Sequence, residues 1–507
     1  MERVAPVMAA AAPEAGDHTG FIRALTLTDA TMLVAGSMIG SGVFIVSADI
    51  GRTVGSPFWL LAVWSVTAVM TVLGALAYGE LAAMYPRAGG QYVFLRESLG
   101  PLPGFLYGWT LFLIIQTGLI AAVAVAFANF CSVLVPAITP AVFTWLPSFS
   151  FNATGGNVVV GLSAQRIVAI ASVWVLTWIN LRGVREGKAV QTSVTAVKTS
   201  VLILLILFGF TAGRHAEALA ANFGPGHFVG LTDLTPTFVL AFAAALVGSL
   251  FSADAWNTVT FAAAEVQNPR RNLPVALVLG TGGVTLLYIL TNVAYLTTLP
   301  FAGDPHGATV MARGIQYATQ DRVGTAAVET VFGGAGAAIM AVAIMISCFG
   351  CNNGLILSGA RVLYAMAKDN LFFKSTGNLN ARQTPGAALK VQATWTTILC
   401  LTGTYSQLLN YVVFAVLIFY VLTTIGLFVL RRTRPDAERP YHAFGYPFLP
   451  ALYIVLALAV AIGLLLADKT RAQAVTGLVL VVLGVPVYYL WRALAPQAPL
   501  PAPNGPR

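Results

Sequence analysis

Two apolar segments carry the residues whose types and spacing could bind a small charged ligand. Residues 36–44 read GSMIGSGVF, and residues 248–257 read GSLFSADAWN. The first segment has three glycines within seven residues, and each glycine weakens a helix by about 1 kcal/mol. The second places Asp254 and Asn257 inside an apolar run. Both patterns predict a helix that is interrupted near its middle.

An interrupted helix inside a membrane exposes backbone groups that can bind charge. Lipid cannot satisfy freed N–H and C=O groups, so these groups must line a cavity. The N-terminal end of a half-helix offers N–H groups to an anion, whereas a C-terminal end offers carbonyl oxygens to a cation. Two such breaks could therefore hold the carboxylate and the ammonium of an α-amino acid. The alternative is that the glycines only allow close helix packing.

Lys198 is the other residue whose position suggests chemistry. It lies about 12 Å into a further apolar segment, eight residues from its start. A buried ammonium there costs several kcal/mol unless it is paired. Either the side chain extends to the membrane surface, or it has partners within the protein.

The composition places these segments in a membrane protein. Of 507 residues, 57% are apolar and only 9% are charged, against about 25% charged residues in soluble proteins. This excludes a soluble enzyme and a disordered chain, and the long continuous apolar runs exclude an outer-membrane barrel. The net charge of +9 does not indicate nucleic acid, because no basic stripe interleaved with aromatic residues is present.

The apolar runs predict an all-α polytopic membrane protein with twelve transmembrane helices. A disordered cytoplasmic tail is expected at 1–25 and another at 496–507, with a single twelve-span domain at 26–495. The predicted spans cover residues 29–50, 57–82, 103–135, 163–181, 190–212, 235–265, 274–299, 333–366, 386–402, 405–431, 447–467 and 472–493.

The distribution of Lys and Arg predicts the orientation of these spans. With the N-terminus inside, 20 of the 28 basic residues lie on the inner side and 7 on the outer side. Such a bias is typical of cytoplasmic loops, so both termini are expected in the cytoplasm. The expected location is the plasma or inner membrane.

The two interrupted spans are the first members of two possible five-span halves, at 29–212 and 235–431, followed by two extra spans at 447–493. Interrupted apolar segments at matching positions of two halves indicate a transporter binding site. Because five is odd, the halves must have inverted topologies.

At this point the sequence resembles the prokaryotic L-type amino acid transporters of the amino acid–polyamine–organocation superfamily, over about residues 27–494. Seven strings carry the resemblance: GSGVF at 40–44, GALAYGEL at 74–81, RAGGQY at 87–92, FSADAWN at 251–257, EVQNPRRNLP at 265–274, SCFGCNNG at 347–354 and RPY at 439–441. It implies a 5+5 inverted repeat with broken helices 1 and 6, and alternating access to a substrate held between the breaks.

The resemblance also implies roles for particular residues. Phe251 would be an aromatic gate over the substrate, or else a core aromatic, and Asn257 would line the pocket or form an interhelical hydrogen bond. The substrate carboxylate would bind the backbone at Ser41, Gly42 and Val43. The ammonium would lie near the carbonyls of Met38, Ile39, Phe251, Ser252 and Asp254.

The resemblance further implies that Lys198 stands in for a sodium ion and contacts the carbonyls of the first break. The expected function is then sodium-independent exchange of L-amino acids, most readily neutral ones. The Asp254 side chain leaves two alternatives open, a proton-coupled symporter and a carrier of cationic amino acids or polyamines; a more distant one is an amino-acid-binding membrane sensor. Glu80 and Glu265 are expected either in gate ion pairs with arginines or in solvent.

No cofactor, metal site or enzymatic activity is expected. The histidines lie in tails or loops, no P-loop is present, and the CFGC string at 348–351 has no His or acidic neighbour that would complete a metal site. Animal relatives attach a heavy chain through a cysteine after span 3. The corresponding loop at 136–162 has no cysteine, so a disulfide-linked heavy chain is not expected.

Overall fold

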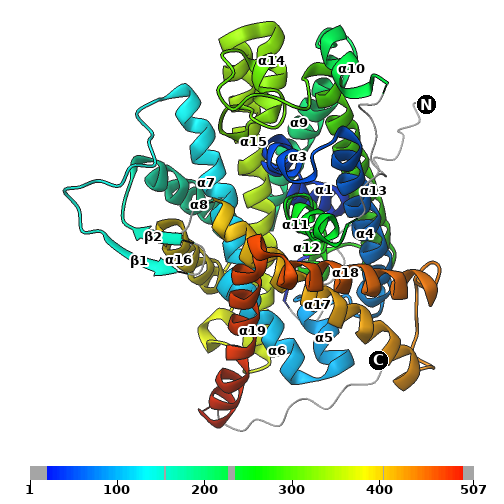
Figure 1. Cartoon of the computed structure of the whole chain (residues 1–507). Coiled ribbons are helices and arrows are strands. Elements are labelled where there is room, and N and C mark those ends of the chain that lie inside the picture. Colours follow the sequence, from blue (N-terminus) through cyan, green and yellow to red (C-terminus); the bar gives the residue numbers. More distant parts are fainter. Residues whose placement is uncertain (1–19, 154–155, 226–234, 403–404, 495–507) are drawn as a thin grey trace, which may run out of the picture.

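The apolar runs fold into long helices, because a helix satisfies its own backbone hydrogen bonds without water. A computed structural model describes residues 20–153, 156–225, 235–402 and 405–494, and Figure 1 shows them as a bundle of helices. The α-helices are α1 (Leu27–Met38), α2 (Gly42–Ile45), α3 (Ser47–Val54), α4 (Pro57–Met84), α5 (Gln91–Leu99), α6 (Pro101–Thr110), α7 (Gln116–Leu134), α8 (Ala164–Leu181), α9 (Val184–Phe210), α10 (Ala216–Phe223), α11 (Pro236–Ser252), α12 (Thr258–Phe261), α13 (Pro269–Thr298), α14 (Val310–Arg313), α15 (Val323–Lys368), α16 (Gly386–Thr402), α17 (Tyr405–Thr433), α18 (Phe448–Leu466) and α19 (Asp468–Leu494).

Shorter elements complete the described chain. A π-helical turn, η1 (Leu111–Ile115), joins α6 to α7, and 3-10 turns lie at η2 (Ala263–Glu265), η3 (Thr319–Asp321) and η4 (Lys374–Gly377). The strands β1 (Phe149–Ala153) and β2 (Gly156–Val160) pair antiparallel as a hairpin between α7 and α8. In Figure 1, α10 and α14 lie at one end of the bundle, and α5 lies at the other.

The chain is a polytopic all-α membrane protein. Each of the twelve predicted spans overlaps a helix, and ten helical segments of the described chain are long and apolar enough to cross a membrane. The other two predicted spans, at 235–265 and 386–402, contain α11 and α16 of 17 residues each. The exact number of twelve therefore stays a prediction.

Both predicted interruptions are present. The first span is divided into α1, ending at Met38, and a second part that begins with α2 at Gly42. In the sixth, α11 ends at Ser252 and α12 begins at Thr258. The first break is enclosed, since α1 packs against α9, α13 and α15.

The predicted tail boundary at residue 25 lies too far along the chain. The side chains of Phe21 and Leu25 are both buried, and the ring of Phe21 contacts that of Tyr364 edge-on at 5.0 Å. Backbone hydrogen bonds of 2.9 and 2.8 Å join Leu25 to Glu265 and Gln267. The buried side chains of Phe21 and Leu25 thus dock residues 20–25 onto the bundle. The remainder of that tail, 1–19, and the tail expected at 496–507 lie outside the described residues.

Candidate functional site

The end of α1 at the first break is held by side chains of other helices. The carbonyl oxygens of residues 36–40 each accept a hydrogen bond from Lys198 of α9, Tyr288 of α13, or Ser347 or Cys351 of α15. The last carbonyls of a helix lack intrahelical partners, and burial without partners would cost about 1–3 kcal/mol for each. Three neighbouring helices therefore stabilise an open helix end in the interior of the bundle.

Lys198 places a positive charge at the carbonyl oxygens that end α1. Its ammonium donates to the carbonyl of Gly36, to that of Ile39 at 2.6 Å, and to that of Ser347 at 3.5 Å. Its exposed fraction is 1%, so the side chain does not extend to the membrane surface. A positive charge at a helix C-terminus interacts favourably with the helix dipole. The contact with the first break is the one that the resemblance implies.

Tyr288 connects the two breaks, and the sequence analysis did not single it out. Its hydroxyl lies 2.9 Å from the carbonyl of Met38 and 3.1 Å from that of Ser252. The carbonyls of Met38 and Ile39, expected near a substrate ammonium, therefore already have partners within the protein. Each carbonyl oxygen has two lone pairs. Met38 therefore keeps one for a ligand, whereas Ile39 already accepts from both Lys198 and Ser347. No local signal marks Tyr288, because it is one more aromatic residue in an apolar helix.

The beginning of α2 has unsatisfied donors. In the part of the chain that the structure describes, the backbone N–H groups of Gly42 and Val43 have no acceptor. The helix continues through Val46 into α3, since Val46 is in the right-handed helical region and its N–H donates to Gly42. A carboxylate would supply what these N–H groups lack. Together with buried Ser41, they form the position at which the resemblance places the substrate carboxylate.

Gly42 also allows the two breaks to approach each other. A Cβ atom on Gly42 would lie 2.1 Å from Oγ of Ser252, 2.7 Å from its Cβ and 3.0 Å from its Cα. Because backbone is among these neighbours, a side-chain rotation at Ser252 cannot make room. The position thus requires glycine.

The second break is a tight turn between α11 and α12. The N–H of Asp254 donates to the carbonyl of Phe251 at 3.2 Å, and Ala255 has a φ of 65°, which is unusual for a residue other than glycine. Of the three carbonyls expected near the ammonium in this span, those of Phe251 and Ser252 have protein donors, whereas that of Asp254 has none among the described residues. The Phe251 side chain itself is buried.

The side chain of Asp254 points towards α17. Its carboxylate accepts a hydrogen bond of 2.5 Å from the hydroxyl of Tyr420. Asp254 and Tyr420 both line two small cavities, of about 20 and 10 Å³. A single water requires at least about 10–15 Å³, so neither cavity has room for an amino acid.

Asn257 forms an interhelical hydrogen bond and also lines the smaller cavity. Its amide donates to the side-chain oxygen of Gln91 at 2.7 Å, and the amide of Gln91 donates to Thr423 of α17 at 3.0 Å. The cavity is lined by Asn257, Gln91 and the π-helical turn at Leu111 and Ile115. Asn257 thus forms an interhelical hydrogen bond, as one interpretation expects, and its place in a substrate pocket stays a prediction. Gln91 is a buried partner that sequence reasoning missed.

Comparison of the sequence with known proteins shows the family to which this chain belongs. The profile of the family described as amino acid permease matches residues 25–485. The chain belongs to the amino acid permease family. It is 29% identical to the serine/threonine exchanger SteT of Bacillus subtilis (strain 168), over 93% of this chain and 98% of that protein. It is 28% identical to the Asc-type amino acid transporter 1 of Mus musculus and 29% identical to the large neutral amino acids transporter small subunit 2 of Homo sapiens, covering 94% and 95% of this chain and 83% of each relative.

Two buried glutamates of the permease form ion pairs, as one of the two sequence interpretations expects. Glu265 accepts hydrogen bonds from Arg361 of α15 at 2.9 and 3.1 Å, and both side chains are 1% exposed. Glu80 of α4 accepts from Arg431 at 2.6 Å and lies 3.3 Å from Arg439. These pairs join α4, the segment after α12, α15 and the end of α17.

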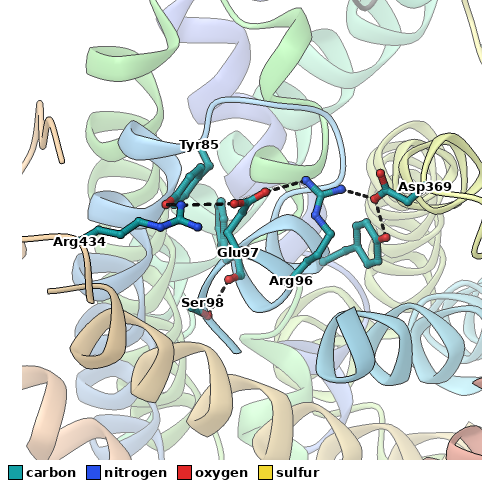
Figure 2. A network of polar contacts seen from close by, with 8 residues as sticks. Tyr85, Arg96, Glu97, Ser98, Asp369 and Arg434 are labelled. Carbon is teal, nitrogen blue, oxygen red and sulfur yellow. Dashed lines mark hydrogen bonds and ion pairs between the residues drawn. The ribbon is translucent and has the colours of Figure 1, made fainter. Parts of the chain in front are cut away.

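A second charged network connects the same helices of the permease through α5. Figure 2 shows Arg434 beside Glu97, and Arg96 between Glu97 and Asp369. The distances are 3.4 Å from Arg434 to Glu97 and 2.9 Å from Glu97 to Arg96, and the hydroxyl of Tyr92 donates to Asp369 at 2.6 Å. Because Asp369 directly follows α15 and Arg434 directly follows α17, movement of either helix relative to α5 would break this network.

Removing the Tyr288 hydroxyl is expected to weaken substrate transport. Tyr288→Phe keeps the ring and its edge-on contact with Trp64 but removes the hydrogen bonds to Met38 and Ser252. We expect kcat/KM for amino acid uptake to fall about 10-fold, the worth of a hydrogen bond of about 1.4 kcal/mol. Tyr78→Phe is the control, because the buried Tyr78 hydroxyl makes no hydrogen bond to either break. Equal effects of the two substitutions would contradict the role of Tyr288.

Neutralising Glu265 is expected to destabilise the permease strongly. Glu265→Gln leaves the Arg361 charge buried without a counter-charge, which costs about 3–5 kcal/mol. The control Glu438→Gln removes the partner of Arg270, where both side chains are more than half exposed, and should cost no more than about 1 kcal/mol. Thermal unfolding in detergent measures both variants. A melting temperature for Glu265→Gln equal to that of the control would show that the buried pair is not needed.

Proposed function

We propose that this permease is a sodium-independent exchanger of neutral L-amino acids. The observation that carries the proposal is the pair of breaks. Gly42, whose N–H is unsatisfied like that of Val43, lies against Ser252 of the second break, and Lys198 occupies the end of α1. A zwitterion can bind there through backbone groups, so the site needs no charged side chain for the substrate. A relative named as a serine/threonine exchanger that shares 98% of its length with this chain supports the same substrate class.

Lys198 supports independence from sodium. Carbonyl oxygens that converge at a helix C-terminus attract a cation, and here the ammonium of Lys198 fills that place. A sodium ion at the same carbonyls would have to displace a covalently attached charge. We infer that the Lys198 ammonium replaces a bound sodium ion at these carbonyls, and that Lys198 couples α9 to the movement of α1.

Alternating access requires the helices around the breaks to move. The cavities beside Asp254 are smaller than any amino acid, and the Glu265–Arg361 and Glu80–Arg431 pairs hold one end of the bundle together. We propose that this end faces the cytoplasm, with both termini inside, because the basic residues gather on that side. Opening of these ion pairs would then release substrate inwards.

We propose that the carrier works in the cell membrane without a disulfide-linked partner. The loop at 136–162 lacks cysteine, and Cys131, the nearest one before it, is buried in α7. The thiol is therefore not available to another chain. Purification under non-reducing conditions should give a species with the mass of this chain alone.

Counterflow in liposomes tests the proposed function. Purified protein is reconstituted into vesicles loaded with unlabelled serine, and uptake of trace radiolabelled amino acids is measured over all twenty side chains. The proposal predicts uptake of neutral amino acids above that of empty vesicles. Saturable binding to the purified protein without any flux would instead indicate a sensor and overturn the proposal.

The buried Asp254 favours one competing function, proton-coupled or cation transport, and a variant pair separates it from neutral exchange. Asp254→Asn removes the acid but keeps a side-chain oxygen that can accept from Tyr420, whereas Tyr420→Phe removes the 2.5 Å hydrogen bond and keeps the acid. If the carboxylate serves only as a hydrogen-bond acceptor, both variants should slow neutral exchange by no more than about 10-fold. Loss of uptake driven by a pH gradient in Asp254→Asn alone would establish the competing function, as would loss of cationic substrates.

A further inference from the structure

A groove on the outer surface of the bundle is separate from the substrate site. It has a volume of about 570 Å³ and lies between α4, the first turns of α13 and the segment that follows α17. Leu76, Val275 and Val278 form apolar walls, and Tyr441 and Phe444 close one side. Arg270 and Arg271 lie at its end. These arginines belong to the EVQNPRRNLP string at 265–274, to which the substrate site gives no role.

The charge at the end of the groove is positive. Arg270 pairs with Glu438 at 2.9 Å, but the two side chains are 56% and 61% exposed, and such surface pairs contribute at most about 1 kcal/mol. Arg271 is exposed and has no ion pair among the described residues. Of the nearby charges, Arg439 is already engaged by the buried Glu80. Two guanidinium groups with one weakly held carboxylate leave a net positive charge for an anion.

The rest of the groove is apolar and faces outwards. Leu279 is 56% exposed and Phe444 is 70% exposed. The same face of α13 continues past Gly282 to Leu286, at helical spacing, and a Cβ on Gly282 would meet nothing within 4 Å. In a membrane-spanning helix such a face contacts lipid chains, and the arginines at its end lie at headgroup level.

We propose that this groove binds an anionic diacyl phospholipid, with its phosphate at Arg270 and Arg271 and an acyl chain along Val278, Leu279 and Gly282. Guanidinium groups bind phosphate oxygens in a bidentate manner, and basic pockets beside transmembrane helices bind anionic headgroups. A free phosphate would use only the arginines and leave the apolar walls uncovered. The lipid covers both parts of the groove, which is why we assign the lipid. This inference does not depend on which substrate the permease carries.

Native mass spectrometry of the purified full-length protein tests the assignment. The protein is held in detergent with equal amounts of phosphatidylglycerol and phosphatidylcholine that have identical acyl chains. We expect bound phosphatidylglycerol to exceed phosphatidylcholine by about 30-fold, from two arginines near the headgroup. The double variant Arg270→Gln/Arg271→Gln should lose this preference. The control Arg185→Gln, at an exposed arginine of α9, should keep it.

A second variant tests the apolar part of the groove without changing charge. Leu279→Trp fills the groove from an exposed position, so the fold should tolerate it, and it should reduce bound phosphatidylglycerol while thermal stability stays unchanged. Preference for phosphatidylglycerol in the double arginine variant would overturn the proposal. Undiminished binding in Leu279→Trp would also overturn it, as would displacement of the lipid by soluble glycerol phosphate at equal concentration, which would indicate a site for free phosphate.

Discussion

Replacing Gly42 with leucine is expected to abolish amino acid transport while leaving membrane insertion intact. The new side chain would begin 2.1 Å from Oγ of Ser252, so it would push the second break away from the first at the residue whose N–H is to receive the substrate carboxylate. Overpacking of a closely packed position costs about 1–3 kcal/mol, and a blocked carboxylate site cannot bind substrate at all. Counterflow should therefore fall to the level of empty vesicles.

A matched glycine separates this effect from a general loss of folding. Gly283 lies on an exposed face of α13, and a Cβ there would meet nothing within 4 Å. Gly283→Leu adds the same four carbons and should transport normally. The amount of each variant in the membrane and its elution from a sizing column give the folded fraction. Normal counterflow by Gly42→Leu would refute the assignment of the carboxylate site to the first break.

Replacing Lys198 with methionine is expected to have the second largest effect. Methionine has a similar length but no charge, so the carbonyl of Gly36 loses its partner and that of Ile39 keeps only Ser347. Each unsatisfied buried carbonyl costs about 1–3 kcal/mol, which corresponds to roughly a 100-fold loss of exchange if α1 can no longer take its native position. Initial rates of counterflow in sodium-free vesicles measure this loss.

Lys188 provides a control on the same helix. Its ammonium donates to the carbonyl of Ala24 and to Asp29 at 2.8 and 2.9 Å, but its side chain is 28% exposed. Lys188→Met should therefore reduce exchange by less than about 10-fold. If Lys198→Met exchanged amino acids as well as Lys188→Met does, the proposed role of Lys198 at the first break would be untenable.

The features predicted best from the sequence are those with a local cause. Glycine content locates the break before Gly42, and continuous apolar runs locate helices because lipid allows few other structures. Lys198 could be singled out because a charge in an apolar run is expensive. Each of these signals lies within a few residues of the feature that it predicts.

The features that sequence reasoning missed depend on partners that are distant along the chain. Tyr288 and Tyr420 are ordinary residues of apolar helices, and Gln91 begins the short polar helix α5. Only the fold shows that their polar groups meet Met38, Asp254 and Asn257. The interhelical hydrogen bond of Asn257 likewise depends on Gln91, which is 166 residues away. The docking of residues 20–25 rests on Phe21 and Leu25, too few apolar residues for a periodic pattern to be recognised.

Trans-stimulation in sodium-free liposomes tests the central claim most directly. Uptake of radiolabelled serine is compared between vesicles loaded with unlabelled serine and empty vesicles, each with and without sodium and with and without an inward pH gradient. We predict uptake that requires internal amino acid and does not change with sodium or with the pH gradient. Uptake into empty vesicles that is driven by either gradient would contradict an exchanger in which Lys198 takes the place of the ion.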